Sequence, residues 1–219
     1  MMKKNGFTLA EVLITLAIIG VVATMTLPAL MNNTAEQQYK TGLKKGINTL
    51  TEAANMNQAI DGFDYASITS DDTESQDEQS LFALLAKRTS IDYARTGEGA
   101  LPSNGASSPD GNFAVFLRDG SAIMYDPAKT VITDADVSTM ENDNLVHGIA
   151  VIYDSNGAKG PNILSNCKGV ANGAEDDGDN EVADACTPSN RVIKDQFGVR
   201  LRGGYAVPNG EAARWAFDN

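Results

Sequence analysis

Residues 7–31 read FTLAEVLITLAIIGVVATMTLPALM, and Glu11 is the only ionisable side chain among them. If these 25 residues form an α-helix rising about 1.5 Å per residue, the helix is roughly 37 Å long, which exceeds the ~30 Å hydrocarbon core of a bilayer. The stretch therefore predicts a membrane-spanning helix. Pro28 removes a backbone N–H donor, and Gly20 lowers helix preference by about 1 kcal/mol relative to Ala, so we expect the helix to kink or unwind easily there.

The residues before this segment indicate its orientation. By the positive-inside rule, Lys3 and Lys4 hold the N-terminus in the cytoplasm, so the chain beyond Met31 is expected outside it. An ordinary secretory signal has a shorter apolar region with a small-x-small cleavage site after it. Here the expected processing point comes before the apolar run, between Gly6 and Phe7. A plain signal anchor is the alternative.

Glu11 needs a physical explanation, because a lone carboxylate in a membrane helix costs a few kcal/mol and is rarely kept without a partner. Cutting after Gly6 creates a free amino group at Phe7. We expect this amino group on a neighbouring, staggered copy to pair with Glu11, so that the pair sets the register of assembly. The alternative is a stray acid on a signal anchor.

The run Lys3 to Ile14, KKNGFTLAEVLI, resembles the N-terminal signature of type IV pilins and type II secretion pseudopilins. The resemblance covers about the first thirty residues. It implies that a prepilin peptidase cuts between Gly6 and Phe7 and methylates the new N-terminus at Phe7. It also implies that Glu11 guides subunits into a filament, and that the segment containing Gly20 and Pro28 loosens when subunits leave the bilayer.

After Met31 the chain becomes polar but keeps a helical period, so the helix is expected to run to about Ala59, before Asp61 and Gly62. We divide the chain into a leader (1–6), a membrane and assembly helix (7–31), its amphipathic continuation (32–62) and a globular head (63–219). The apolar stripe of the continuation consists of Ala35, Tyr39, Leu43, Ile47, Leu50 and Ala54.

The head is expected to be α+β. Residues 63–80 are polar and predict a surface loop with little to bury, and Ser80 to Arg88 predict a short helix. Asp119-Gly120 predicts a tight turn between two alternating strands. Four short strands on one long helix give an antiparallel sheet, which is also what the pilin resemblance implies. The expected strands are 113–117, 122–125, 149–153 and 197–201.

Composition excludes some functions. With 17 Lys+Arg against 29 Asp+Glu, the net charge of −12 argues against direct nucleic-acid binding. The only histidine is His147, and no GxSxG, HExxH or Walker A motif occurs, so we expect no enzyme. The lone Trp215 is compatible with a core plug or an exposed tip contact.

Asp154 to Asn162 read DSNGAKGPN, where Asp and Asn at alternate positions with Gly can turn several oxygens toward a cation such as calcium. The same pattern is also a common turn. Similar segments occur in pilin-like heads, followed closely by a strand that resembles Lys194 to Phe197, and calcium at this end is a property of secretion pseudopilins. We therefore name Asp154, Asn156 and Asp195 as candidate calcium ligands, although residues 163–193 intervene.

That insertion contains both cysteines, Cys167 and Cys186, which we expect to pair if the head lies outside the cytoplasm. A bridge closing a loop of about twenty residues stabilises by roughly 3 kcal/mol in the chain-entropy model. The six acids of this loop suggest a second calcium site, a contact surface or simply a solvated loop. They are Glu175, Asp176, Asp177, Asp179, Glu181 and Asp184.

The sequence thus predicts a structural subunit of a type IV pilus-like filament. Its expected partners are copies of itself or related pilins, prepilin peptidase, the pilus or secretion assembly machinery, and the inner (cytoplasmic) membrane before assembly. From there it would enter a periplasmic or cell-surface filament. A pseudopilin of a type II secretion system is one alternative, and a membrane-anchored binding domain that never polymerises is another. No cofactor besides the candidate calcium is expected.

Overall fold

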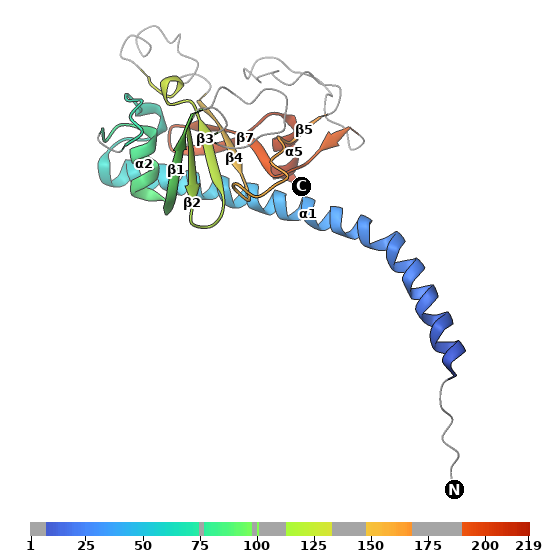
Figure 1. The fold of residues 1–219 in the computed structure, drawn as a ribbon. Helices are drawn as coiled ribbons and strands as arrows, with labels where there is room; N and C mark the ends of the chain where they lie inside the picture. Colours follow the sequence, from blue (N-terminus) through green and yellow to red (C-terminus); the bar gives the residue numbers. More distant parts are fainter. Residues whose placement is uncertain (1–7, 75–76, 98–99, 101–112, 133–147, 168–189) are drawn as a thin grey trace. The chain divides into compact units, whose positions relative to one another are not determined.

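The computed structural model describes residues 8–74, 77–97, 100, 113–132, 148–167 and 190–219 (Figure 1). The chain divides into two compact units, Met1–Gln38 and Tyr39–Asn219, and each is described by itself. The first unit holds the apolar N-terminal segment, and the second is the globular head.

A single helix, α1 (Leu9–Asp61), contributes to both units and has 53 residues. Gly20 and Pro28 both lie within the residues assigned to it. The long helix predicted from the apolar run and the following stripe is therefore confirmed, and it ends at Asp61, directly before Gly62, whose φ of 80° is in the region that favours glycine.

The head contains a six-stranded sheet in the order β1-β2-β3-β4-β7-β8, in which every neighbouring pair is antiparallel. The predicted α+β fold is confirmed. The four predicted strands form the centre of the sheet, and two edge strands that were not predicted complete it. The strands are β1 (Ile91–Thr96), β2 (Phe113–Leu117), β3 (Ala122–Tyr125), β4 (Ile149–Asp154), β7 (Gln196–Arg202) and β8 (Tyr205–Asn209).

Shorter elements surround this sheet. The predicted short helix is α2 (Leu81–Arg88), whose N-cap Ser80 accepts a 3.0 Å hydrogen bond from the Ala83 N–H through its hydroxyl. Its last turn carries Lys87 and Arg88, and both contact Asp61 at the end of α1. The remaining elements are a two-stranded ribbon of β5 (Asn166–Cys167) and β6 (Arg191–Val192), the helix α5 (Glu211–Asp218), and the 3₁₀ turns η1 (Tyr65–Ser67) and η2 (Pro127–Lys129).

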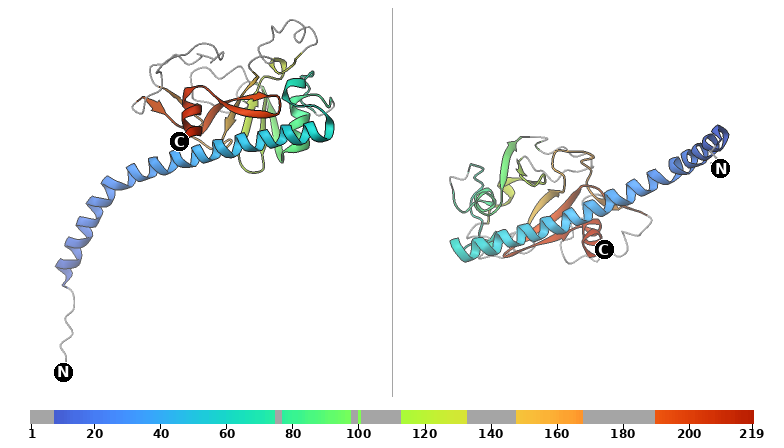
Figure 2. Two further views of the ribbon diagram at one scale, coloured as in Figure 1. Left: turned by 180° about the vertical axis from the view of Figure 1, so that it is seen from behind. Right: turned by 90° about the horizontal axis from the view of Figure 1, so that it is seen from below.

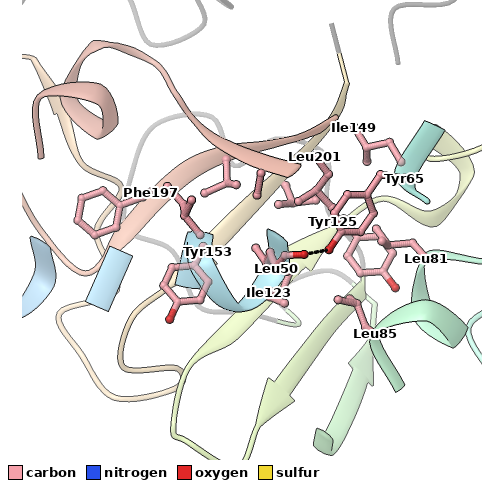
Figure 3. Close-up of a cluster of buried hydrophobic side chains, with 14 of the residues drawn as sticks. Leu50, Tyr65, Leu81, Leu85, Ile123, Tyr125, Ile149, Tyr153, Phe197 and Leu201 are labelled. Atoms are coloured by element: carbon pink, nitrogen blue, oxygen red, sulfur yellow. Dashed lines mark hydrogen bonds between the residues drawn. The ribbon is translucent and has the colours of Figure 1, made fainter. Parts of the chain in front are cut away.

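The head portion of α1 lies along one face of the sheet, as the views in Figures 1 and 2 agree. From the predicted stripe, Leu43, Ile47, Leu50 and Ala54 are buried there. Figure 3 shows Leu50 among the side chains of the core, where its carbonyl accepts a 2.7 Å hydrogen bond from the Tyr65 hydroxyl. The amphipathic half of the helix thus forms one wall of the core.

The expectation that residues 63–80 bury little is wrong. Phe63, Tyr65 and Ile68 are buried, with Tyr65 only 1% exposed. They close the end of the core beside α1 and α2, because the chain turns back at Gly62 and passes over the last turns of α1. The prediction failed because it relied on the overall polar composition of the segment, in which these three apolar residues are a minority.

Candidate functional site

The first turn of α1 holds Glu11 in a fixed arrangement with Thr8. The Glu11 Oε2 atom accepts hydrogen bonds from the Thr8 N–H and from the Thr8 hydroxyl, both at 2.8 Å. In return, the Glu11 N–H donates to the Thr8 Oγ1 at 3.3 Å. These reciprocal bonds form a capping box, which satisfies backbone donors that a helix start leaves without intrahelical partners.

Sequence reasoning missed this role of Thr8. The pattern Thr8-x-x-Glu11 immediately before an apolar helix is the sequence signature of a capping box, and it was present in the quoted stretch. Glu11 therefore has a partner within its own chain. Both described side-chain bonds of Glu11 use Oε2, so its carboxylate is held by one oxygen.

The segment that follows is suited to an apolar environment. Leu9–Leu27 is long and apolar enough to cross a membrane, and none of it is buried among the residues that the structure describes. Its hydroxyl groups are internally satisfied, because Thr15 and Thr24 donate to the carbonyls of Val12 and Val21 at 2.9 and 2.8 Å. Polar groups in lipid need such internal hydrogen bonds, because the bilayer core contains no water to bond with them.

The remaining predicted sites of this unit are placed only in part. Gly6 and Phe7 lie outside the described residues, so cleavage and methylation there stay predictions. Gly20 and Pro28 lie inside α1, and their loosening during assembly also stays a prediction.

In the head, the structure brings Asp154 and Asp195 to the same loop. Asp154 ends β4 and Asp195 immediately precedes β7, and the side chains of both are fully buried. Burial, together with the nearby charge of Asp195, raises the pKa of Asp154 to about 7, although the hydrogen bonds donated by Gln196 and by the Asn156 N–H act in the opposite direction. Within the part of the chain that the structure describes, no group of three or more His, Cys, Asp or Glu side chains could hold a metal ion.

The insertion is described only at its base. Cys167 lies in β5 and is buried, whereas Cys186 and the six acids lie outside the described residues, so the disulfide stays a prediction. His147 also lies outside them.

Trp215 is neither a fully buried plug nor an isolated tip contact. The Lys40 Nζ lies 3.9 Å and the Arg191 Cζ 3.4 Å from its ring centroid, so α5 contacts the first head turn of α1 and the β6 strand through cation–π interactions.

Comparison with known families now adds to this geometry. Residues 1–27 match the family described as the prokaryotic N-terminal methylation motif. No curated protein and no solved structure matches the chain. The motif indicates a structural protein family rather than an enzyme family, and it occurs on the same residues as the capped, exposed apolar helix. The chain therefore carries, at residues 1–27, the signature of type IV pilins and secretion pseudopilins.

Proposed function

We propose that this chain is a structural subunit of a type IV pilus-like filament, cut by prepilin peptidase between Gly6 and Phe7 and methylated at Phe7. The observation that carries the proposal is the methylation motif on residues 1–27, which coincides with the start of an apolar helix whose side chains are exposed in the described part of the chain. A filament of packed helices, or a bilayer before assembly, would supply that cover.

In this proposal Glu11 has two roles in succession. Its Oε2 caps the helix by accepting hydrogen bonds from Thr8. Its other oxygen, Oε1, accepts a hydrogen bond from the Phe7 amino group of a neighbouring copy. Pairing of the two charges away from water fixes the stagger between subunits, because an unpaired carboxylate in an apolar environment is costly.

Substitutions at Glu11 separate these roles. Glu11→Gln keeps an oxygen that can cap the helix but removes the charge, whereas Glu11→Ala removes both. We expect both variants to insert in the membrane and to be absent from filaments sheared from cells. Glu52→Ala, which removes an exposed carboxylate of the same helix outside the apolar segment, is the matched control and should assemble normally.

The measurement is mass spectrometry of the N-terminal peptide in sheared filaments and in washed membranes. A methylated peptide that begins at Phe7 and is abundant in the sheared fraction supports a surface pilin. The same peptide confined to membranes favours a pseudopilin of a type II secretion system or a rare minor subunit. An intact Met1 leader in both fractions would instead mean a membrane-anchored domain that never polymerises. Assembly of Glu11→Gln at the wild-type level would refute the charge pairing and leave only the cap.

A further inference from the structure

The loop of residues 154–163 begins at the last residue of β4 and leads toward β5, and it is the segment for which the pilin-like pattern implies calcium (Figure 1). Calcium takes six to eight oxygen ligands, so the test is whether the oxygens of this loop point toward a common space. The hydrogen bonds of the loop show where the carboxylate oxygens of Asp154 and Asp195 point.

Asp195 holds both ends of the loop. Its Oδ2 accepts the Asn162 N–H at 2.7 Å and its Oδ1 accepts the Ile163 N–H at 2.9 Å, across a separation of 33 and 32 residues. Its backbone carbonyl accepts the Ser155 N–H at 2.9 Å. A single buried residue outside the loop thus binds three of its backbone amides, and both of its carboxylate oxygens are engaged by N–H donors.

Asp154 is engaged in the same way at the start of the loop. Its Oδ1 accepts the Asn156 N–H at 3.0 Å, and its Oδ2 accepts a hydrogen bond from the side-chain amide of Gln196 at 2.9 Å. Each oxygen of this carboxylate therefore already accepts a hydrogen bond from a neutral N–H donor.

The two asparagines complete the loop by donating hydrogen bonds to its carbonyl groups. In the amide orientation that satisfies its neighbours, the Asn162 Nδ2 donates to the carbonyls of Gly157 at 3.2 Å and Lys159 at 3.1 Å. The Asn156 Nδ2 donates to the Gly160 carbonyl at 3.4 Å. Among the described residues, two buried oxygens of the loop have no hydrogen-bond partner, the Ser155 Oγ and the Asn156 Oδ1, and two such oxygens fall short of the six to eight ligands of calcium.

We propose that Asp154 and Asp195 act as metal-independent clamps: their carboxylates hold this loop closed by accepting hydrogen bonds from amide N–H groups. The head then keeps its fold and the conformation of this loop without calcium. This inference does not depend on filament assembly. It separates the chain from proteins whose corresponding end is organised by a bound cation.

The experiment uses the full chain in detergent and compares thermal unfolding in EDTA with unfolding in excess CaCl₂. We expect the wild-type Tm to be the same in both within about 1 °C. Asp195→Asn should lower the Tm by about 3–10 °C equally in both, because it leaves a buried amide hydrogen without its acceptor. Asp218→Asn removes the same charge from an exposed position of α5 and should leave the Tm unchanged.

A local readout keeps the test decisive if the global shift is small. Lys159 is exposed in the loop, and its bond to Gly160 is a tryptic site. We expect faster cleavage after Lys159 in Asp195→Asn than in the wild type or Asp218→Asn, with or without calcium. A calcium-dependent rise in the wild-type Tm that Asp195→Asn abolishes would overturn the proposal, as would saturable heat on titrating CaCl₂ into EDTA-treated wild type that the same variant removes.

Discussion

Asp154 shows how one buried carboxyl group couples the stability of the head to pH. Burial raises its pKa to about 7, whereas an Asp in an unfolded chain titrates near 3.9. Between these values the folded state binds more protons than the unfolded state. The contribution of Asp154 to the free energy of unfolding is therefore fully present below about pH 4, decreases as pH rises toward 7, and is lost above it.

We predict that Asp154→Asn, which imitates the neutral acid, removes this decrease. As the pH rises from 4.5 to 7.5, the variant should become more stable relative to the wild type. The free energy of unfolding of the variant minus that of the wild type should increase by at most about 1.4 kcal/mol per pH unit, the limit for one proton. Urea unfolding at several pH values measures it. Other titrating groups cancel in the difference, so parallel curves for the two proteins would contradict the raised pKa.

At the scale of elements, the contact between α1 and β4 depends on two glycines one turn apart. A Cβ atom at Gly46 would lie 2.3 Å from the Cζ of Tyr153, and one at Gly42 would lie 2.6 Å from the Cβ of Ser155. Glycines lower helix preference, but here they let the helix backbone approach the strand closely. The cost within the helix is offset by packing against the sheet.

We predict that Gly46→Ala lowers the free energy of unfolding of the head by about 1–3 kcal/mol, despite the better helix propensity of alanine, because Tyr153 is buried and has little room to move. Chemical denaturation measures the effect. Asn48→Ala, on the exposed face of the same helix, is the control and should be neutral or slightly stabilising. The second substitution Tyr153→Leu should recover part of the loss; purely additive effects would argue against a direct clash.

At the scale of the whole molecule, the two units are suited to different environments. Every residue of the main hydrophobic core comes from Tyr39–Asn219, whereas the Leu9–Leu27 segment contributes none of its side chains to that core. The head therefore has a hydrophobic core of its own. The N-terminal segment instead presents apolar side chains that suit lipid or the surface of other helices.

We predict that a chain lacking residues 1–31 is a soluble monomer whose Tm lies within a few degrees of that of the full chain in detergent. Circular dichroism and light scattering measure this. Removing residues 1–46 takes away Leu43 and the contact at Gly46, and this shorter chain should lose cooperative unfolding. An aggregated or unfolded product of the first truncation would show that the apolar segment supports the head.

The sequence by itself determined the features that depend on neighbours along the chain. The apolar segment, the continuous helix and the hairpin around Asp119-Gly120 follow from periodicity and turn chemistry within a few residues. The capping box of Thr8 and Glu11 could also have been predicted from the sequence, because it depends on a pattern of only four residues. These features need no knowledge of what lies across the core.

Only the tertiary structure decided the features that join distant parts of the chain. Strand β1 has mostly exposed side chains and β8 contains Pro208, so neither shows the alternation of a half-buried strand, and pairing with β2 and β7 defines them. The burial of Tyr65, the clamp of Asp195 on the loop and the position of Trp215 likewise depend on residues far away in sequence. Packing between residues that are far apart in the sequence determines these contacts, so the pattern of neighbouring residues does not predict them.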